Sequence, residues 1–248
     1  MKITKYENAI FGLRPIIEAI TAGQEIDTLF IQKGLKGDIF PELWELVKKH
    51  RVKYKHVPVE KLNRLTRKNH QGVFAFVSPI TFHRTENVIP QLFEAGKVPL
   101  FLILDRVTDV RNFGAIVRSA ECSGVHAIII PERGSAAING DAMKTSAGAL
   151  SSVPICREFN LKATLDFLKN SGIQVVACTE KTEDLIYAPD YTIPTAIIMG
   201  SEEDGISEEY LKLCTHKTKI PMSGNIGSLN VSVAAGVILY EAVRQRKS

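Results

Sequence analysis

Residues 219–241, KIPMSGNIGSLNVSVAAGVILYE, carry the strongest fold signal in the chain. Their pattern predicts a strand ending at Pro221, a loop with two glycines, and a long apolar helix over residues 228–244. Ser228 stands where the N-cap of this helix is expected, because its hydroxyl can accept a hydrogen bond from an early N–H. A helix that is apolar on nearly every side must be buried. Periodicity alone leaves open an ordinary strand, loop and core helix.

The sequence before this stretch alternates strands and helices from Pro99 onward, which is typical of an α/β fold. Its strands are nearly continuous apolar runs such as FLIL and AIII, and this composition predicts a parallel sheet buried on both faces. We expect strands at residues 100–105, 127–131, 153–156, 175–179, 196–200 and 218–221, and helices at 112–123, 161–171 and 207–214. Ligands of such sheets bind beyond the carboxyl ends of the strands, where Asp105, Thr179 and Gly200 lie.

The first 78 residues alternate in the same way on a smaller scale and predict a compact α/β module. The expected helices lie within residues 8–22, 39–50 and 60–67, and the expected strands at 28–32, 54–57 and 73–77. Residues 79–97 contain two prolines and predict a linker that leads to a short helix. The predicted domains are therefore residues 1–78 and 98–248.

Basic residues are concentrated in the first domain. Residues 1–78 hold 14 Lys and Arg against 8 Asp and Glu, a net charge of +6, whereas residues 79–248 hold 17 against 19, a net charge of −2. Nine of these cations lie within residues 48–70. Cations near phosphates release counterions, so this cluster predicts salt-dependent RNA binding, with a merely solvated surface as the alternative. The predicted RNA-binding residues are Lys48, Lys49, Arg51, Lys53, Arg64, Arg67 and Lys68.

Several classes of protein are disfavoured by what the sequence lacks. The sequence contains no run of about 18 apolar residues, so no transmembrane helix is expected. The N-terminal MKITKYENAIFGL lacks the apolar core of a signal peptide, which favours a cytoplasmic protein. The four cysteines lie far apart in apolar contexts, so we expect buried thiols and no metal site. GxGxxG, GxxxxGK[ST], HExxH and GxSxG are absent, which disfavours dinucleotide enzymes, P-loop NTPases and common hydrolases.

Three segments resemble the motifs of the SpoU/TrmH family of RNA ribose 2′-O-methyltransferases. They occur in the family's order and spacing: LDRVTDVRNFGAIVRSAECSGV at 104–125, AIIMGSEEDGIS at 196–207 and IPMSGNIGSLNVSVAAG at 220–236. The N-terminal IFGLRPIIEAI and HQGVFAFV resemble the ribosomal-protein-like (L30e-type) RNA-binding domain of some members. One departure is Val110, where the family usually has proline.

The resemblance implies a C-terminal parallel-sheet SPOUT domain with a trefoil knot and a small N-terminal L30e-like α/β domain. It also implies S-adenosyl-L-methionine (SAM) as methyl donor, a homodimer, and a guanosine ribose of 23S rRNA as the target. A tRNA 2′-O-methyltransferase, a catalytically silent RNA-binding protein and a small-molecule enzyme are the alternatives. The polar residues of the three motifs are retained, which argues against a protein without catalytic activity. The basic first domain argues against a small-molecule substrate.

The resemblance also implies the site residues. The candidate catalytic residues are Asn112, Arg118, Glu202, Ser228 and Asn230, and the candidate SAM contacts are Thr179, Gly200, Ile220, Met222, Leu229 and Asn230. We expect Arg118 to polarise the 2′-hydroxyl and stabilise the alkoxide, because a guanidinium stays protonated in proteins and is therefore a poor base. Gly200 would let the adenine approach the backbone. The simpler alternatives are helix capping for Asn112, Ser228 and Asn230, an ion pair with Glu121 for Arg118, and a solvated loop for Glu202.

Overall fold

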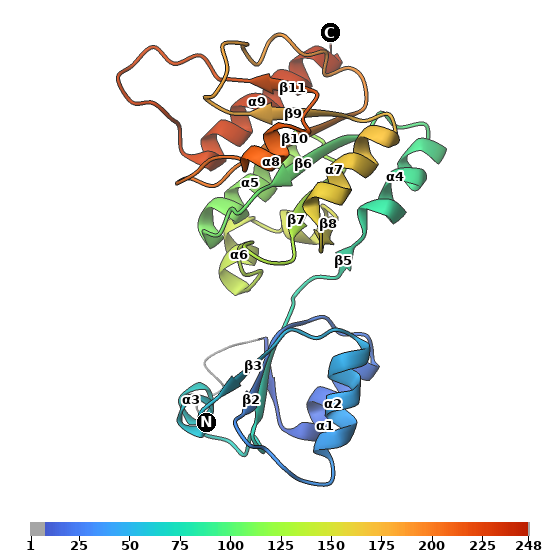
Figure 1. Cartoon of the computed structure of the whole chain (residues 1–248), viewed down its shortest axis with the longest axis vertical. Coiled ribbons are helices and arrows are strands. Elements are labelled where there is room, and N and C mark those ends of the chain that lie inside the picture. The colour runs from blue at the N-terminus through green and yellow to red at the C-terminus, as the bar shows by residue number, and fades with distance from the viewer. Residues whose placement is uncertain (1–7, 248) are drawn as a thin grey trace. The chain divides into compact units, whose positions relative to one another are not determined.

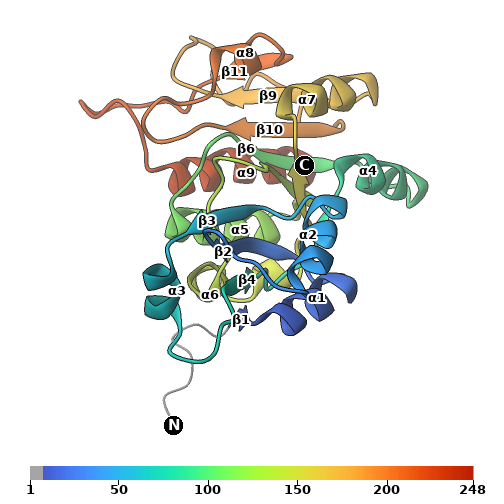
Figure 2. The same cartoon turned by 60° about the horizontal axis from the view of Figure 1, so that its bottom comes forward.

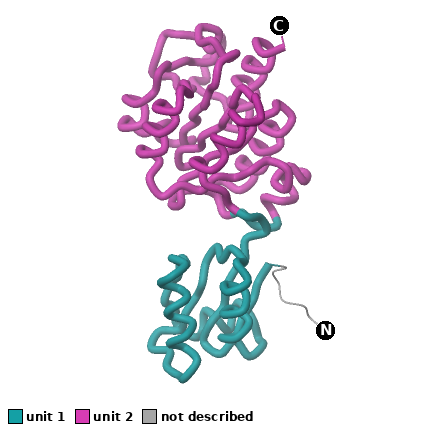
Figure 3. Tube along the Cα trace, turned by 90° about the vertical axis from the view of Figure 1, so that its right-hand side faces the viewer, with its two compact units in different colours: residues 1–81, 138–140 teal, residues 82–137, 141–248 magenta. Residues whose placement is uncertain are grey.

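The structure, a computed structural model, describes residues 8–247. Residues 1–7, which begin the predicted first domain and the segment considered for a signal peptide, lie outside the described residues. The chain divides into two compact units, residues 1–81 with 138–140 and residues 82–137 with 141–248 (Figure 3). Each unit has a hydrophobic core of its own.

Within the described part of the chain, the first unit contains a four-stranded sheet of order β1-β4-β2-β3. Its strands are β1 (Ala9–Phe11), β2 (Ile26–Gln32), β3 (Tyr54–Val57) and β4 (Val73–Val77). Strand β3 pairs in parallel with β2, and the other pairs are antiparallel. Helices α1 (Leu13–Thr21) and α2 (Phe40–Lys49) lie beside each other (Figure 1). Their apolar residues are buried in one core cluster. The short helix α3 (Val59–Leu65) contributes Leu62 to a second cluster.

Among residues 82–247, seven parallel strands form the sheet of the second unit, in the order β11-β9-β10-β6-β7-β8-β5. They are β5 (Phe82–His83), β6 (Leu100–Leu104), β7 (Ala127–Pro131), β8 (Ile155–Glu158), β9 (Gln174–Cys178), β10 (Thr195–Met199) and β11 (His216–Thr218). Figure 2 shows β11, β9, β10 and β6 side by side in this order. The predicted parallel sheet is therefore confirmed.

Helices cover both faces of this sheet, as the apolar composition of its strands requires. Helices α4 (Thr85–Glu94), α7 (Leu161–Asn170) and α8 (Glu208–Leu211) share one core cluster with alternate residues of the strands. Helix α5 (Val110–Cys122) packs against α9 (Val231–Lys247). Residues Phe113 and Ile116 of α5 and Ile238 and Leu239 of α9 are fully buried.

The differences from the sequence predictions lie mainly in short elements. Strands β1 and β5, helix α6 (Gly140–Thr145) and the 3-10 turn Ala149–Ser151 were not expected. Strand β5 and helix α4 occupy most of the predicted linker, 79–97, and belong to the second unit. None of the described helices is long and apolar enough to cross a membrane. The trefoil knot stays a prediction from the resemblance.

Candidate active site

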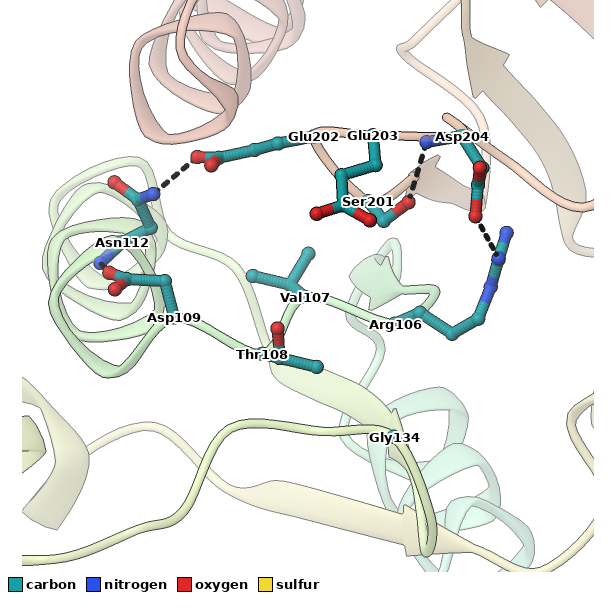
Figure 4. A pocket seen from close by; sticks show the side chains of 10 residues that line it. All are labelled: Arg106, Val107, Thr108, Asp109, Asn112, Gly134, Ser201, Glu202, Glu203 and Asp204. Atoms are coloured by element: carbon teal, nitrogen blue, oxygen red, sulfur yellow. Dashed lines mark hydrogen bonds and ion pairs between the residues drawn. The ribbon is translucent and has the colours of Figure 1, made fainter.

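The crevice between strands β6 and β10 is where the chain connections diverge. These strands are neighbours in the sheet, with Leu104 opposite Met199. After β6 the chain continues into α5, which packs against α9. After β10 it continues into α8, which shares its core cluster with α4 and α7. The two connections therefore lead to different groups of helices. Open parallel sheets form their ligand crevice at such a switch point. A cavity of about 310 Å³ lies here, between the loop after β6 and the turn after β10 (Figure 4).

The lining of this cavity is polar and largely acidic. Four carboxyl side chains and one cation contribute to it: Asp109, Glu202, Glu203, Asp204 and Arg106. Such a lining can accept hydrogen bonds from hydroxyl groups and favours a positively charged ligand over a free phosphate. Of the predicted site residues, Asn112 and Glu202 line the cavity.

Asn112 is available for this site because another residue caps its helix. The side chain of Asp109 accepts a hydrogen bond of 2.7 Å from the backbone N–H of Asn112, which makes Asp109 the N-cap of α5. The capping role considered for Asn112 is therefore wrong. Val110 occupies the first helical position, where proline is favoured because the N–H there needs no intrahelical partner.

The three predicted motifs meet in one hydrogen-bonded cluster. The Nδ2 of Asn112 donates to Oε1 of Glu202 (Figure 4). The Nδ2 of Asn230 donates to Asn112 Oδ1 at 3.1 Å and to the same Glu202 Oε1 at 3.2 Å. Glu202 Oε2 has no hydrogen-bond partner within residues 8–247, so this oxygen can accept one from a substrate hydroxyl. Each residue thus comes from a different motif and contributes to a shared polar centre.

Asn230, and not Ser228, marks the start of the last helix. Helix α9 begins at Val231, and Asn230 Oδ1 accepts hydrogen bonds from the N–H and the hydroxyl of Ser232 at 2.9 and 2.6 Å. The N-cap predicted at Ser228 is therefore wrong, because the chain stays non-helical until Asn230. Capping holds Asn230 Oδ1 in place while its Nδ2 reaches the cluster. Ser228 lies in the exposed loop before it.

A buried carboxylate holds the turn that carries Glu202. Asp105, 2% exposed, accepts hydrogen bonds from the N–H and hydroxyl of Ser207 at 2.8 and 2.7 Å. It also forms a two-bond ion pair with Arg106, whose guanidinium continues to Asp204 at 3.0 Å and to the carbonyl of Gly205 at 3.1 Å. Hydrogen bonding to Asp105 raises the pKa of Arg106, so this group stays charged. The second half of the turn and the residue Ser207 after it are therefore tied to the end of β6.

No sequence motif indicates the role of Arg106. Its backbone has φ of 59°, a conformation that few side-chain-bearing residues adopt. Its partners Asp204 and Gly205 lie almost a hundred residues away, so no local pattern indicates them. The one available signal was Asp105 itself, a carboxylate at the end of an apolar strand, because a buried charge requires partners.

Gly200 is required by the same turn. A Cβ at this position would lie 2.0 Å from the carbonyl carbon of Gly205 and 2.2 Å from the N of Ile206. Ser201 and Gly205 exchange two backbone hydrogen bonds of 3.1 Å, which bring that backbone over Gly200. The turn itself therefore requires glycine here, in addition to the close approach of an adenine that the family resemblance implies.

Arg118 does not join the cluster. It lies on α5 six residues after Asn112, which on an ideal helix places it about 120° around the axis from Asn112. Its side chain is exposed and makes no hydrogen bond or ion pair with the part of the chain that the structure describes, Glu121 included. The ion pair with Glu121 that was considered as the simpler alternative is therefore not formed.

The remaining predicted SAM contacts lie in loops at the same edge of the sheet. Thr179 directly follows β9, and its N–H donates to the carbonyl of Thr218 at the end of β11. Ile220, Met222 and Leu229 lie between β11 and α9, and the last two are exposed. Neither Gly224 nor Gly227 in this loop has a positive φ.

The four cysteines differ in their exposure. All four are free thiols, and the predicted burial holds fully only for Cys156, since Cys178 and Cys214 are partly buried and Cys122 is exposed. Burial raises the pKa of the Cys156 and Cys178 thiols to about 12, which keeps them protonated at neutral pH. No group of three or more His, Cys, Asp or Glu residues that could hold a metal ion occurs between residues 8 and 247.

Family models match both units of the chain. The model of the SpoU rRNA Methylase family matches residues 99–240, more than half of the chain. A model described as RNA 2′-O ribose methyltransferase substrate binding matches residues 9–83. The chain therefore belongs to the SpoU rRNA methylase family, and it is a SAM-dependent RNA 2′-O-methyltransferase.

Individual relatives agree with this assignment. A protein assigned to the TrmH family of tRNA/rRNA methyltransferases from Staphylococcus saprophyticus is 34% identical over 97% of this chain and 96% of its own length. The 23S rRNA (guanosine-2′-O-)-methyltransferase RlmB of Photorhabdus laumondii is 44% identical over 72% of this chain and 73% of its own. The SpoU methyltransferase AviRb of Streptomyces viridochromogenes, solved in complex with AdoMet, aligns with a TM-score of 0.61 and 28% identity over 96% of this chain and 90% of AviRb.

The residues at the sheet edge fit SAM as the cofactor. Its sulfonium is a cation, which suits the acidic lining around Glu202. Its adenine has apolar faces, which suit the exposed side chains of Met222 and Leu229 in the loop after β11. These residues, with the loop ends at Thr179 and Gly200, are the ones that would hold the cofactor.

Proposed function

We propose that the target of this methyltransferase is a guanosine ribose of 23S rRNA, methylated in the cytoplasm. The support is the 44% identity to the RlmB enzyme of Photorhabdus laumondii. A tRNA target is the second candidate, because the relative from Staphylococcus saprophyticus carries a tRNA/rRNA description. Within the chain, we assign residues 1–78 to RNA binding and residues 98–248 to methyl transfer.

The cluster of Asn112, Glu202 and Asn230 is the observation that carries the proposed mechanism. SAM, when bound, supplies an electrophilic methyl group on a sulfonium sulfur. We assign Glu202 Oε2 the role of accepting a hydrogen bond from a ribose hydroxyl, since its Oε1 is already occupied by both asparagine amides. The amides of Asn112 and Asn230 hold the carboxylate of Glu202 in place. The turn that carries Glu202 is held by the hydrogen bonds and ion pairs of Asp105 and Arg106 to Asp204, Gly205 and Ser207, which we call the clamp. Arg118 would stabilise negative charge on the 2′-oxygen as it attacks.

The target is tested by mapping the product. Unmodified 23S rRNA and unmodified tRNA are incubated separately with radiolabelled SAM and the enzyme, and the 2′-O-methyl nucleotide is located in each. We expect one labelled guanosine in 23S rRNA. Labelling confined to tRNA would favour the second candidate, and labelling of neither would overturn both.

The basic cluster of the first unit is expected to supply RNA affinity without affecting SAM. Lys48, Lys49, Arg51 and Lys53 are all exposed. Replacing all four by alanine should reduce the magnitude of the slope of log K against log salt by up to about 3.6, because each phosphate contact contributes ~0.7–0.9. Filter binding over a salt series measures this slope, and calorimetry measures SAM affinity. An RNA affinity within twofold of wild type would show that the cluster is only a solvated surface.

We further propose that the active enzyme is a homodimer formed through helix α9. Val233, Val237 and Tyr240, spaced to share one face of the helix, are 51%, 38% and 54% exposed in the single chain. Burying such a face in a second copy would remove apolar surface from water. We expect light scattering at micromolar concentration to give a dimer, and Val237→Glu to give a monomer.

A matched control for the dimer is Phe159→Glu, which alters a 75% exposed apolar residue outside α9 and should leave the dimer intact. A wild-type monomer that transfers methyl groups at full rate would contradict the proposal.

A further inference from the structure

The first unit carries an aromatic cluster on its surface that the basic residues alone do not explain. Four rings from helix α2 and strand β3 adjoin one another: Phe40, Trp44, Tyr54 and His56. The centroid of Trp44 lies 6.1 Å from that of Phe40 and 5.1 Å from that of Tyr54. Tyr54 and His56 are 5.5 Å apart, and their planes are 77° from parallel. Despite these contacts Tyr54 is 43% exposed, and His56 is exposed as well.

The positions of these rings follow from the periods of the two elements. Phe40, Trp44 and Lys48 are four residues apart on α2 and share one side of the helix. Tyr54 and His56 are two residues apart on β3 and point to the same face of the sheet. Phe40 and Trp44 rest partly on the core of this unit, which anchors one side of the cluster and leaves the other toward solvent.

Strand β3 is also the edge strand of its sheet. The strand order places it last, paired with β2. An exposed aromatic surface next to a free edge is accessible to an extended ligand, because no further described strand lies beside it. A surface of this kind usually has a function when it is flanked by polar residues.

The charge around the rings identifies the kind of ligand. The amine of Lys48 lies 5.4 Å from the centroid of Trp44. Residues 48–57, KKHRVKYKHV, contain five Lys or Arg and no acid, and Lys49, Arg51, Lys53 and Lys55 are exposed. Cations that follow a phosphate backbone, together with aromatic rings on which bases stack, are the combination found in proteins that bind single-stranded nucleic acid.

We propose that Trp44, Tyr54 and His56 form a base-stacking subsite for an unpaired segment of the RNA substrate. This proposal rests on the proposed RNA-binding function of the first unit and assigns separate roles to its cations and its aromatic rings. The cations contact phosphates, and the exposed ring of Tyr54, supported edge-on by Trp44 and His56, receives a base. Unpaired RNA is the occupant, because a base inside a duplex cannot present its face to a ring.

The chain offers a direct probe of this subsite, because Trp44 is its one tryptophan. Single-stranded RNA and a duplex of the same sequence are titrated into the full-length protein while the emission of Trp44 and the anisotropy of the labelled RNA are recorded. We expect the single strand to quench Trp44 emission and the duplex to change it little. Tyr54→Ala should weaken single-strand binding about 5- to 150-fold, which corresponds to the ~1–3 kcal/mol reported per stacked base.

Two further variants separate stacking from folding. Tyr54→Phe keeps the ring and loses only the hydroxyl, so it should bind single-stranded RNA like the wild type. His56→Ala removes an exposed ring from the edge of the cluster and should weaken binding while Trp44 emission without RNA still reports a folded unit. Phe159→Ala, in the second unit, is the matched exposed aromatic outside the cluster and should have no effect.

The outcomes distinguish this proposal from the function on which it rests. If RNA binds by anisotropy while Trp44 emission is unchanged and Tyr54→Ala binds like the wild type, the stacking subsite is refuted and the RNA-binding role survives. Equal quenching by the duplex would also refute it, since a base pair cannot stack there. If neither RNA binds, the RNA-binding function of the first unit fails and the subsite fails with it.

Discussion

Replacing Arg118 by alanine is expected to lower the single-turnover rate of methyl transfer about 10²- to 10³-fold, the usual cost of losing a preorganised charge donor. SAM affinity should change little. The 2′-oxygen gains negative charge as it attacks the methyl carbon, and a nearby cation stabilises that charge only as it develops. Such an interaction lowers the barrier without tightening the ground state.

The state of Arg118 in the structure is consistent with this role. Its side chain is exposed on α5, and none of residues 8–247 neutralises it. The absence of a fixed acidic partner leaves the guanidinium free to meet the RNA. Its position around the helix differs from that of Asn112, so we expect it to approach the ribose from another side than the cluster of Asn112, Glu202 and Asn230. Removal of a proton by this group is disfavoured because a guanidinium stays protonated in proteins and so cannot accept the proton.

The controls for Arg118 lie on the same helix. Arg118→Lys should restore the rate poorly, because a compact ammonium cannot reproduce the planar fork of a guanidinium. Arg111→Ala removes an exposed arginine from the first turn of α5 and should leave the rate near wild type. Single-turnover rates and SAM titrations of the three variants decide the question. If Arg118→Ala keeps more than about a tenth of the rate, below the cost expected on this scale, the residue is structural.

Most of the longer regular elements could be predicted from the sequence to within about three residues at each end; the strands predicted at 153–156 and 218–221 and the helix predicted at 228–244 are the ones shifted by two or three residues. Strands β3, β4 and β7 have the predicted bounds, because β-rich runs flanked by turns or helices leave few alternatives. The short strands β1 and β5 could not be predicted, since two or three residues carry no periodicity. Their pairing depends on β4 and β8, which lie more than 60 residues away in the chain.

Within the site, the residues that belong to motifs could be predicted, whereas the residues that position them could not. The motif resemblance indicated Asn112, Glu202 and Asn230, and the structure joins them by hydrogen bonds. The residues that hold these three side chains in position could not be predicted from the sequence. Asp109 rather than Asn112 caps α5, and Asn230 rather than Ser228 caps α9, because several capping residues occur near each helix start and only the backbone path selects one. The clamp by Arg106 depends on an unusual φ, which sequence patterns do not reveal.

Gly200→Ala is expected to disrupt the turn that carries Glu202. Of the substitutions proposed here, it should therefore cause the largest combined loss of stability and activity. The added Cβ would lie 2.0 to 2.4 Å from three backbone atoms of Gly205 and Ile206. Backbone cannot rotate away as a side chain can, so the two hydrogen bonds between Ser201 and Gly205 must break or lengthen. Forcing extra atoms into packed structure typically costs ~1–3 kcal/mol, which for a chain of this size lowers Tm by several degrees.

The activity should fall more than the stability suggests. A displaced turn moves the carboxylate of Glu202 away from Asn112 and Asn230, and it weakens the ties to Asp105 through Ser207 and Arg106. We expect methyl transfer to fall at least 10²-fold, since misplacement of catalytic groups by about 1 Å can have this cost. SAM binding should weaken as well, because the predicted cofactor loop begins at Gly200. Calorimetric unfolding, SAM titration and single-turnover rates measure the three effects.

The matched control for this substitution is Gly224→Ala. A Cβ at Gly224 meets nothing within 4 Å, and its φ is not positive, so alanine fits there without strain. Its Tm and transfer rate should stay near wild type. Both glycines lie in loops at the same sheet edge, so a difference between them isolates the close backbone approach at Gly200 from any general effect of stiffening a loop. A Gly200→Ala enzyme with the wild-type Tm and rate would mean that the turn can open without cost, and the clamp through Asp105 and Arg106 would then not be what positions Glu202.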